Sequence, residues 1–410
     1  MNPASAYDQG SGPGLEVKEH TSPDEFKSLE PVWNELVRAM PGPSLYVSFD
    51  WLWTWWQCFG GGKKRLRILS VTEKGRTIAI APFMQVRRRF LGIPYETIEF
   101  ISARNYAFSH LTMSGLMDII ARERAEEAAR AILLHMLAGP SRWIYMRLEP
   151  LAEGGTVLAG LSRVASGLGL RIREGETFEA YEASLSSGWE GRRLGGEGRQ
   201  RDASVAMEEK LRRHGDLSWE DTLGSEAQES LFETILGVEK RSWKWNRGLS
   251  INALGYAGFY RAFLGAAARS RSLRITLLRL DGRAVAYVYS ALFGGTLEAL
   301  KTAYDGSFAR FSPGRLVLWH HVKEAAKEGI PRVNLHIGSK EYKSEWATDS
   351  RIYREVFLMR PTPRGRLVGF FLFTLGLYGR FRFIPDLSKR VLRRAGFSPR
   401  WSELTREDQV

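Results

Sequence analysis

The sequence predicts a duplicated α/β fold, in which two domains are joined by a basic helical segment. Each domain is expected to hold a mixed, mostly antiparallel sheet flanked by helices. The chain of 410 residues is long enough for two to three domains. Two hairpin patterns, at 67–83 and 274–289, align without gaps, and similar elements surround each of them. Hydrophobic residues make up 44% and charged residues 26%, which excludes collagen-like, wholly disordered and polytopic membrane proteins.

The first domain is predicted over residues 15–182, after a loose tail at 1–14 rich in Gly, Pro and Ser. Ser22 to Glu25 is a capping box, so a helix should begin there. The aromatic segment 49–59 favours a buried helix over a surface on which nucleic-acid bases stack. In chain order the predicted elements are helix 23–39, helix 49–59, hairpin 67–83 with its turn at Lys74-Gly75, helix 121–138 and strand 142–148.

The second domain is predicted over residues 216–362 and repeats this order. Its hairpin turns at Asp281-Gly282, at an offset of 207 residues from the first hairpin. The order of the elements carries more weight than the five identities between the hairpins, which chance can produce in apolar strands. The predicted elements are helix 256–268, strands 274–280, 283–289 and 297–303, helix 314–328 and strand 332–337.

The charge of the chain is basic, because 59 Lys and Arg face 46 Asp and Glu, which leaves a net charge of +13. This balance favours a partner that carries phosphate, or an anionic membrane surface. The connecting segment 183–215 contributes seven Lys and Arg against five acidic residues. It is either a solvated helical linker or an arm that grips phosphates, and the sequence leaves both open.

The C-terminal tail, 363–410, combines an apolar stretch at 367–379 with six Lys and Arg between 380 and 394. The stretch is shorter than the ~20 residues that span a bilayer. Two interpretations stay open, an interfacial element that lies on an anionic membrane through 363–394 and a helix packed on the second domain. The single cysteine, Cys58, and the absence of a signal-peptide pattern predict a cytoplasmic protein, either free or peripheral at the inner membrane face.

Familiar catalytic spacings are missing from the sequence, which has no P-loop, H-E-x-x-H, C-x-x-C or G-x-S-x-G pattern. His320 and His321 are neighbours on a predicted helix and point about a quarter-turn apart. We therefore expect them on the surface or in the core, and we expect no metal site.

One local motif is typical of an anion site. A strand ends at Tyr304-Asp305, and Ser312-Pro313-Gly314 then begins an amphipathic helix. Ser312 is expected to cap this helix, Pro313 suits its first position, and Gly314 leaves the free N–H groups approachable. Such a helix start binds pyrophosphate. The alternative is an ordinary strand-to-helix turn.

Three stretches of the second domain together resemble the CelD/BcsL-type acetyltransferases of the GNAT superfamily. They are E-K-R-S-W-K at 239–244, L-K-T-A-Y-D-G-S-F-A-R-F-S-P-G at 300–314 and E-Y-K-S-E-W-A-T at 341–348. The tryptophan-rich segment of the first half and the strand that ends at Ala81-Pro82-Phe83 also look like this family. The architecture is similar to the tandem GNAT arrangement of FemAB-type peptidoglycan aminoacyltransferases.

The resemblance implies transfer of an acyl group from acetyl-CoA or another acyl-CoA, used as co-substrate, with no cofactor tightly bound. The acceptor would be the amine or hydroxyl of a small molecule or saccharide, in exopolysaccharide or envelope biosynthesis. The family pattern for pyrophosphate is Q/R-x-x-G-x-G/A, and this chain keeps one glycine where two small residues are usual. The expected coenzyme contacts are Arg310, Ser312, Pro313, Gly314 and Arg315.

Direct acyl transfer needs a base for the acceptor and an acid for the leaving thiolate. Asp305, at a strand end, is the candidate base; Tyr342 is the candidate acid, and Lys343 would hold a phosphate or an acceptor carboxylate. The acceptor side is expected to be lined by Glu239, Trp243, Lys244, Tyr304 and Trp346. Two alternatives stay open, a FemAB-like transferase that uses aminoacyl-tRNA and a non-catalytic scaffold of a polysaccharide synthase complex.

Overall fold

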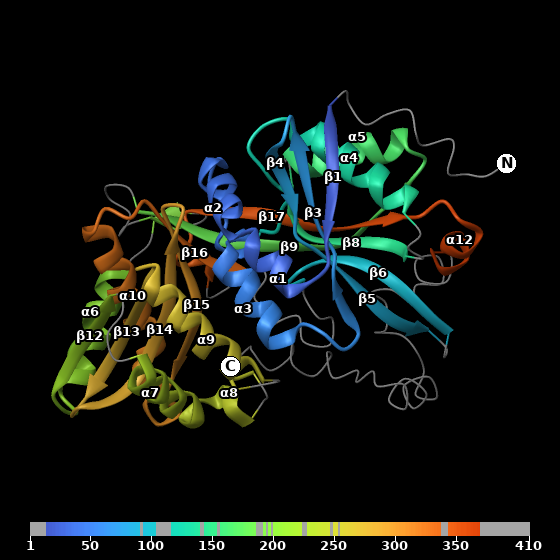
Figure 1. Cartoon of the computed structure of the whole chain (residues 1–410). Helices are drawn as coiled ribbons and strands as arrows, with labels where there is room; N and C mark the ends of the chain where they lie inside the picture. Colours follow the sequence, from blue (N-terminus) through green and yellow to red (C-terminus); the bar gives the residue numbers. More distant parts are fainter. Residues whose placement is uncertain are drawn as a thin grey trace.

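The computed structural model describes most of the chain between residues 14 and 369. The described ranges are 14–90, 93–103, 116–139, 143–153, 156–185, 192–193, 196–197, 200–223, 228–246, 249–252, 255–337 and 343–369. They form an 11-stranded sheet, a four-stranded sheet and a two-stranded ribbon, with helices packed on both sides (Figure 1). The prediction of mixed α/β domains is confirmed.

The first half holds most of the elements that the sequence predicts. They are β1 (Leu15–His20), α1 (Pro23–Ser28), α2 (Glu30–Ala39), η2 (Leu45–Val47), α3 (Phe49–Phe59), β2 (Lys64–Leu66), β3 (Ile68–Glu73), β4 (Arg76–Ala81), β5 (Phe83–Phe90), β6 (Ile93–Phe100), β7 (Ile120–Ala121), α4 (Ala125–Ala138), β8 (Trp143–Ala152), α5 (Thr156–Gly167) and β9 (Arg171–Ser184). The capping box at Ser22 forms as predicted, but the helix expected over 23–39 is two helices. They divide at Leu29 because Pro31, in the first turn of α2, has no N–H to continue α1.

The second half begins with a small ribbon and a helix and then repeats the pattern. Its elements are β10 (Arg192–Arg193), β11 (Gly196–Glu197), α6 (Gln200–Arg212), β12 (Leu217–Leu223), α7 (Gln228–Arg241), α8 (Trp243–Asn246), α9 (Tyr256–Arg269), β13 (Leu273–Leu280), β14 (Arg283–Phe293), β15 (Thr296–Tyr304), η6 (Gly306–Phe311), α10 (Pro313–Lys327), β16 (Arg332–Ile337), β17 (Asp349–Met359) and α12 (Pro363–Gly369). Helix α6 occupies part of the basic connecting segment and packs against α10 and η6.

Both predicted hairpins form, as antiparallel pairs β3–β4 and β13–β14. Their turns have positive φ at Lys74 and Gly75 and at Asp281 and Gly282. This conformation suits a tight hairpin turn, and the glycine adopts it without steric cost. The two copies differ in their sheets, because β3–β4 belongs to the four-stranded sheet and β13–β14 to the long one.

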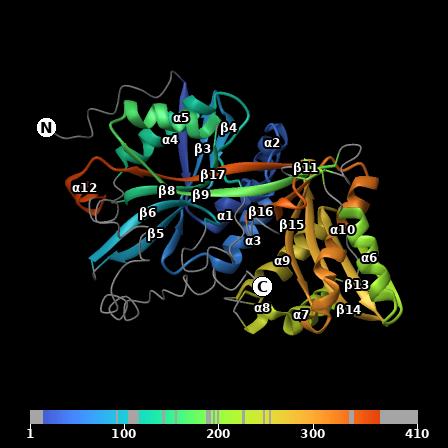
Figure 2. The ribbon, with the colours of Figure 1, turned by 180° about the vertical axis from the view of Figure 1, so that it is seen from behind.

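The long sheet joins the two halves through strands β9 and β17. Its order is β12-β13-β14-β15-β16-β9-β17-β8-β6-β5-β2. The last strand of the first half, β9, thus pairs with β16 of the second, while β17 pairs with β8 of the first. The two strands also pair with each other along their length, and they lie side by side across the middle of the molecule (Figures 1 and 2). Each half therefore completes the sheet of the other.

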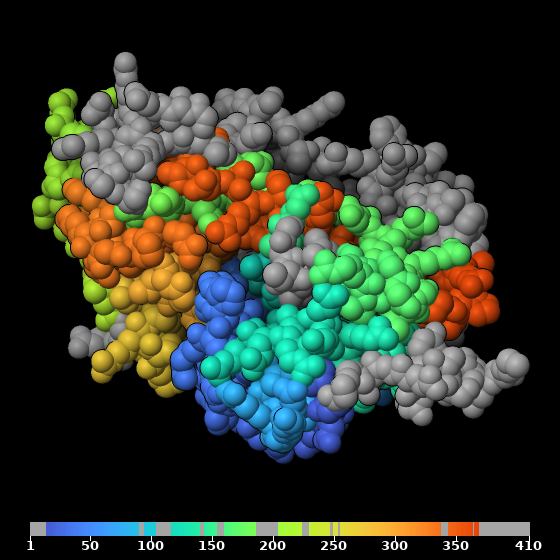
Figure 3. Space-filling model, turned by 90° about the horizontal axis from the view of Figure 1, so that it is seen from above, coloured from blue at the N-terminus to red at the C-terminus, as the bar shows by residue number. Residues whose placement is uncertain are grey.

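The aromatic helices α3 and α9 pack against each other where the halves meet. Trp51 of α3 contacts the rings of Phe259 and Phe263 of α9, at centroid distances of 4.9 and 4.8 Å. Trp51 is 2% exposed, so the prediction of a buried helix at 49–59 is confirmed. The space-filling view shows residues of the first half, in blue and teal, directly against the gold and orange residues of the second (Figure 3).

The predicted interfacial tail lies mostly outside the described residues, which reach only α12 of the segment 363–394. In the part of the chain that the structure describes, no helix is both long enough and apolar enough to cross a membrane.

Candidate functional site

The candidate site lies where the parallel strands β15 and β16 separate. They pair only over Thr296–Glu298 and Arg332–Asn334. β15 then continues to Tyr304, hydrogen-bonded on its other edge to β14. The edge of β15 after Glu298 therefore has no strand partner on the β16 side among the described residues. Helix α10 begins after η6, at the end of this open edge.

Three lysines gather beside this open edge, one from each stretch that carries the family resemblance. Lys244 of α8 donates from Nζ to the carbonyl of Thr302, at 2.6 Å. Lys343 donates to three carbonyls at the end of β16, Leu335, His336 (3.2 Å) and Ile337 (2.8 Å). Lys301 of β15 lies with Nζ 5.3 Å from the centre of the Tyr260 ring and has no hydrogen-bond partner among the described residues. All three side chains stay partly exposed.

Burial and neighbouring charges lower the pKa values of the three lysines. Burial, followed by the charge of Lys244, lowers the pKa of Lys301 to about 8. Burial, with the charges of Lys244 and Lys301, lowers the pKa of Lys343 to about 7. The pKa of Lys244 is also lowered by burial, although nearby Glu239 opposes that shift. The group therefore lies in a poorly hydrated place, where the protonated form of each lysine is disfavoured.

Glu239 is the carboxylate that faces this lysine cluster. It comes from α7, which packs on β14 and β15, and it is 1% exposed. Its Oε1 accepts a hydrogen bond from the hydroxyl of Tyr287 at 2.5 Å, while its Oε2 has no hydrogen-bond partner in the part of the chain that the structure describes. A buried oxygen without a partner is costly, so it marks a position where a donor from a ligand can bind.

A second polar group, Tyr46, His336 and Glu298, joins the first half to this site. The Tyr46 hydroxyl of η2 lies 3.2 Å from Nδ1 and 3.3 Å from Nε2 of His336. Glu298 of β15 lies 3.4 Å from the same ring. Burial raises the pKa of Glu298 to about 8, and burial with the charges of Lys343 and Lys301 lowers the pKa of His336 well below its ordinary value. His336 has φ +62, a strained conformation of the kind found at functional sites.

The loop predicted to bind pyrophosphate is built differently from the expectation. Ser312 does not cap α10 with its side chain, because it adopts φ 50 and ψ 49. Pro313 does occupy the first turn. A Cβ on Gly314 would lie 2.9 Å from Cδ1 of Tyr304, so this glycine is required by the ring of Tyr304. Arg315 pairs with Glu345 at 2.7 Å, and Arg310 lies over the ring of Phe311.

Asp305 is held as a structural ion-pair partner, which argues against the role of base predicted for it. Its Oδ2 accepts hydrogen bonds from Arg241 at 2.6 Å and Arg283 at 2.5 Å. Its Oδ1 accepts from the backbone and hydroxyl of Ser307 and so caps η6. Although burial opposes the shift, these hydrogen bonds lower the pKa of Asp305. A carboxylate with both oxygens engaged and a lowered pKa is a poor proton acceptor.

Of the other predicted residues, Trp243 is 38% exposed beside the Lys244 ammonium. Trp346 is buried and packs against Trp319 of α10. Tyr342, the predicted acid, lies outside the described residues.

The structure adds five residues to the site that the sequence analysis did not select: Lys301, Tyr287, Glu298, His336 and Tyr46. For Lys301 a signal existed, because it stands in the stretch 300–314 that was already singled out.

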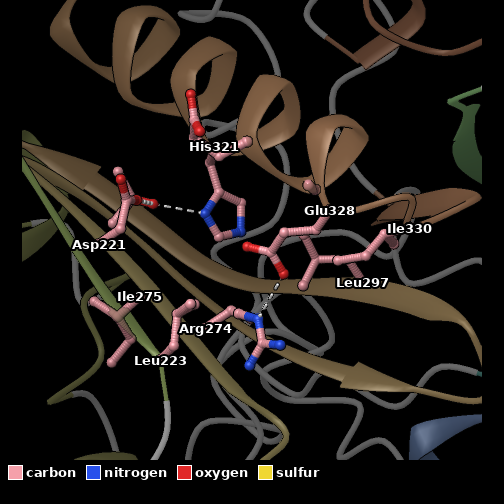
Figure 4. Close-up of a pocket in the computed structure, with 11 residues that line it drawn as sticks. Asp221, Leu223, Arg274, Ile275, Leu297, His321, Glu328 and Ile330 are labelled. Atoms are coloured by element: carbon pink, nitrogen blue, oxygen red, sulfur yellow. Dashed lines mark hydrogen bonds and ion pairs between the residues drawn. The ribbon is translucent and has the colours of Figure 1, made fainter.

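A cavity of about 180 Å³ lies elsewhere, between α10 and strands β12 and β13 (Figure 4). Arg274 and Glu328 form an ion pair at one side of it. His321 reaches into it, bonded to Thr276 and Ser290, whereas His320 stacks on Trp219 and pairs with Asp221. The adjacent histidines thus have different partners, and no cluster able to hold a metal ion occurs among the described residues. This cavity is on the α10 side of the sheet, whereas the lysine cluster is on the α7 and α9 side.

Residues 198–344 match the family model described as the acetyltransferase (GNAT) domain. The match contains β12 to β16 and all three lysines, and it identifies an acyltransferase. A search of curated protein sequences finds no match.

Solved structures share the fold of nearly the whole chain. The crystal structure of FemX has a TM-score of 0.57 and 11% identity, and the alignment covers 86% of this chain and 99% of that one. The C-terminal domain of a lysylphosphatidylglycerol synthetase from Agrobacterium fabrum has a TM-score of 0.52 and 13% identity, with 85% and 95% covered. A protein from Bacteroides thetaiotaomicron has a TM-score of 0.50 and 10% identity, with 84% and 100% covered. At these identities the likeness shows the tandem GNAT fold alone.

Proposed function

We propose that this acyltransferase is an acyl-CoA-dependent N- or O-acyltransferase of the CelD/BcsL type. The observation that carries the proposal is the open edge of β15, which ends at the start of α10 and is lined by the lysine cluster and Glu239. All of these residues lie inside the segment that matches the GNAT domain. The same resemblance supports a role in exopolysaccharide or envelope biosynthesis, with a small molecule or saccharide as acceptor.

The coenzyme is expected to bind at the start of α10, with its pyrophosphate near Gly314, Arg310 and Arg315. Helix N-termini favour negative charge because their first N–H groups are unpaired. Pro313 has no N–H and the N–H of Arg315 donates to the carbonyl of Ser312, so within this first turn the N–H of Gly314 would take the contact to pyrophosphate. The thioester would then extend along the edge of β15 that has no strand partner, beside the Thr302 carbonyl bound by Lys244, and other backbone groups of this edge would hold its amides.

The base in this proposal is Glu239, which replaces Asp305 in that role. The acceptor nitrogen or oxygen attacks the thioester carbonyl and gives its proton to Oε2 of Glu239, the oxygen without a partner. The new bond to nitrogen or oxygen forms while the C–S bond breaks. The thiolate leaves with the electron pair and takes a proton from the ammonium of Lys301, which the Glu239 carboxylic acid can then restore.

A second candidate, an aminoacyl-tRNA-dependent transferase, is favoured by the FemX-like fold and the basic connecting segment. The structure supplies an argument against an extended basic track along α6. Arg212 there pairs with Glu208 at 2.7 Å and also donates to the carbonyl of Leu217. The charge of α6 is therefore partly neutralised within the chain.

Titration with each donor separates the two candidates. We expect acetyl-CoA, or a longer acyl-CoA, to bind with micromolar affinity that changes only modestly between low and physiological salt. We expect tRNA to bind weakly and to lose affinity steeply with salt, because each neutralised phosphate releases counterions. Calorimetry at two salt concentrations measures both. Tight tRNA binding at physiological salt, without coenzyme binding, would make the tRNA-dependent function the better one.

A further inference from the structure

When its members are protonated, the lysine cluster carries more positive charge than the described residues around it neutralise. Among the described residues, Glu239 is the one carboxylate whose charge acts on Lys244 and Lys301. Burial is the largest cause of the lowered pKa values of Lys301 and Lys343, and neighbouring charge adds to it, from Lys244 on Lys301 and from both on Lys343. Holding three ammonium groups together in a poorly hydrated place lowers the stability of the fold unless an anion binds among them.

The neighbouring titratable groups do not supply that anion. Glu298 has a pKa of about 8, so it is mostly protonated at neutral pH. His336 is neutral there, because its pKa is lowered well below its ordinary value. Asp305 is occupied by Arg241 and Arg283. None of these groups compensates the protonated lysines. A bound anion would do so and would favour the protonated forms of Lys301 and Lys343, and the partial exposure of all three lysines leaves them within its reach.

We propose that Lys244, Lys301 and Lys343 form an acceptor subsite that binds a carboxylate or phosphate group of the acyl acceptor. The inference rests on the proposed acyltransferase function and adds the chemical class of its substrate: an anionic amine or alcohol. Lys244 and Lys343 are anchored by backbone carbonyls, whereas Lys301 keeps its ammonium free of hydrogen bonds to the described residues. An anion between them would accept charge-assisted hydrogen bonds, which are about twice as strong as neutral ones.

The lysine cluster and the expected pyrophosphate site lie on opposite faces of the sheet, which favours the acceptor over the coenzyme as the ligand of this subsite. Lys301 lies against Tyr260 of α9, and Lys244 follows α7, so the cluster is on the α7 and α9 face. Helix α10, whose start is the expected pyrophosphate site, covers the opposite face and packs on β13, β14 and β15. The base, Glu239, is on the lysine side. An acceptor held by the lysines would thus present its nucleophile to Glu239 and meet the thioester at the open edge.

Calorimetric titration with inorganic phosphate, and separately with acetate, tests the subsite in the full chain. We expect saturable binding of at least one of the two at millimolar concentration or tighter. Lys301→Gln should weaken that binding at least 10-fold, because Lys301 holds no backbone group that folding requires. The matched control is Lys327→Gln on α10, an exposed lysine paired with Glu324, which should bind as the wild type does. Absence of saturable binding of both anions, or equal binding by Lys301→Gln, would overturn the subsite.

A titration with coenzyme A tests whether the anion that the lysines bind belongs to the acceptor or to the donor. We expect coenzyme A to bind the phosphate-saturated wild type, and Lys301→Gln to keep its coenzyme affinity within about twofold. Competition between phosphate and coenzyme A for the lysines would assign them to the donor and overturn the acceptor subsite. A wild type that binds phosphate through Lys301 but no coenzyme would leave the anion site standing and contradict the proposed function instead.

Discussion

Glu239→Gln is expected to lower turnover by at least ~10²-fold while the affinity for acetyl-CoA changes less than about twofold. The amide keeps the shape of the side chain and still accepts the hydrogen bond from Tyr287 at Oε1, but it cannot take a proton. Because Oε2 of Glu239 has no hydrogen-bond partner among the described residues, the loss should appear in the chemical step. The rate is measured as thiol release from acetyl-CoA across a panel of anionic amines and alcohols.

The control for this variant is Glu233→Gln on the same helix. Glu233 is exposed and pairs with Arg261 at 2.6 Å, far less buried than Glu239, so its replacement should leave turnover near that of the wild type. Wild-type turnover in Glu239→Gln would remove the proposed base. A loss confined to KM would instead give Glu239 a binding role.

Arg147→Met is expected to lower the free energy of unfolding by ~3–5 kcal/mol, the largest effect on stability that the structure predicts. Arg147 of β8 is 1% exposed and pairs with Glu355 at 2.7 Å, with Glu149 and, at 3.8 Å, with Glu99. Its removal takes this partner from three buried carboxylates, of which Glu99 keeps its ion pair with Arg88. Denaturant unfolding followed by circular dichroism measures the change.

Arg354→Met on β17 is the matched control for this network. Arg354 also pairs with two carboxylates, Glu153 and Glu174, but these are largely exposed. Exposed ion pairs contribute little, so the control should lose less than ~1 kcal/mol. Equal losses in the two variants would show that burial of the Arg147 network has no energetic consequence.

Local sequence signals predicted the repeat and the type of most elements, because these depend on neighbouring residues. The Lys74-Gly75 and Asp281-Gly282 turns fixed two hairpins, and the aromatic spacing of 49–59 gave a buried helix. The exchange of β9 and β17 between the halves was not predictable in this way. It depends on pairing between strands more than 160 residues apart, such as Ser350 with Tyr181, which no local pattern encodes.

In the candidate site, too, residues in short motifs were predictable from the sequence, whereas roles that depend on distant contacts were not. Lys244, Lys343 and Glu239 were selected from short motifs, and the structure brings them together. Asp305 was selected as a base because it stands at a strand end, and its arginine partners, 64 and 22 residues away, were not visible from that position. Conversely, Lys301 stands one residue before Thr302, whose carbonyl accepts from Lys244, and the packing of α8 and α9 showed that both lysines lie at the same edge.

The central claim, that an acyl-CoA donor binds at the start of α10, is tested most directly by acetyl-CoA calorimetry on Gly314→Glu. The added carboxylate would stand at the expected pyrophosphate position, and its Cβ would press on Tyr304. The matched control is Gly258→Glu on α9, an exposed glycine with open space around its Cβ. We predict that folded Gly314→Glu shows no measurable acetyl-CoA binding, while the wild type and Gly258→Glu bind it equally. Unchanged acetyl-CoA affinity in folded Gly314→Glu would contradict the account.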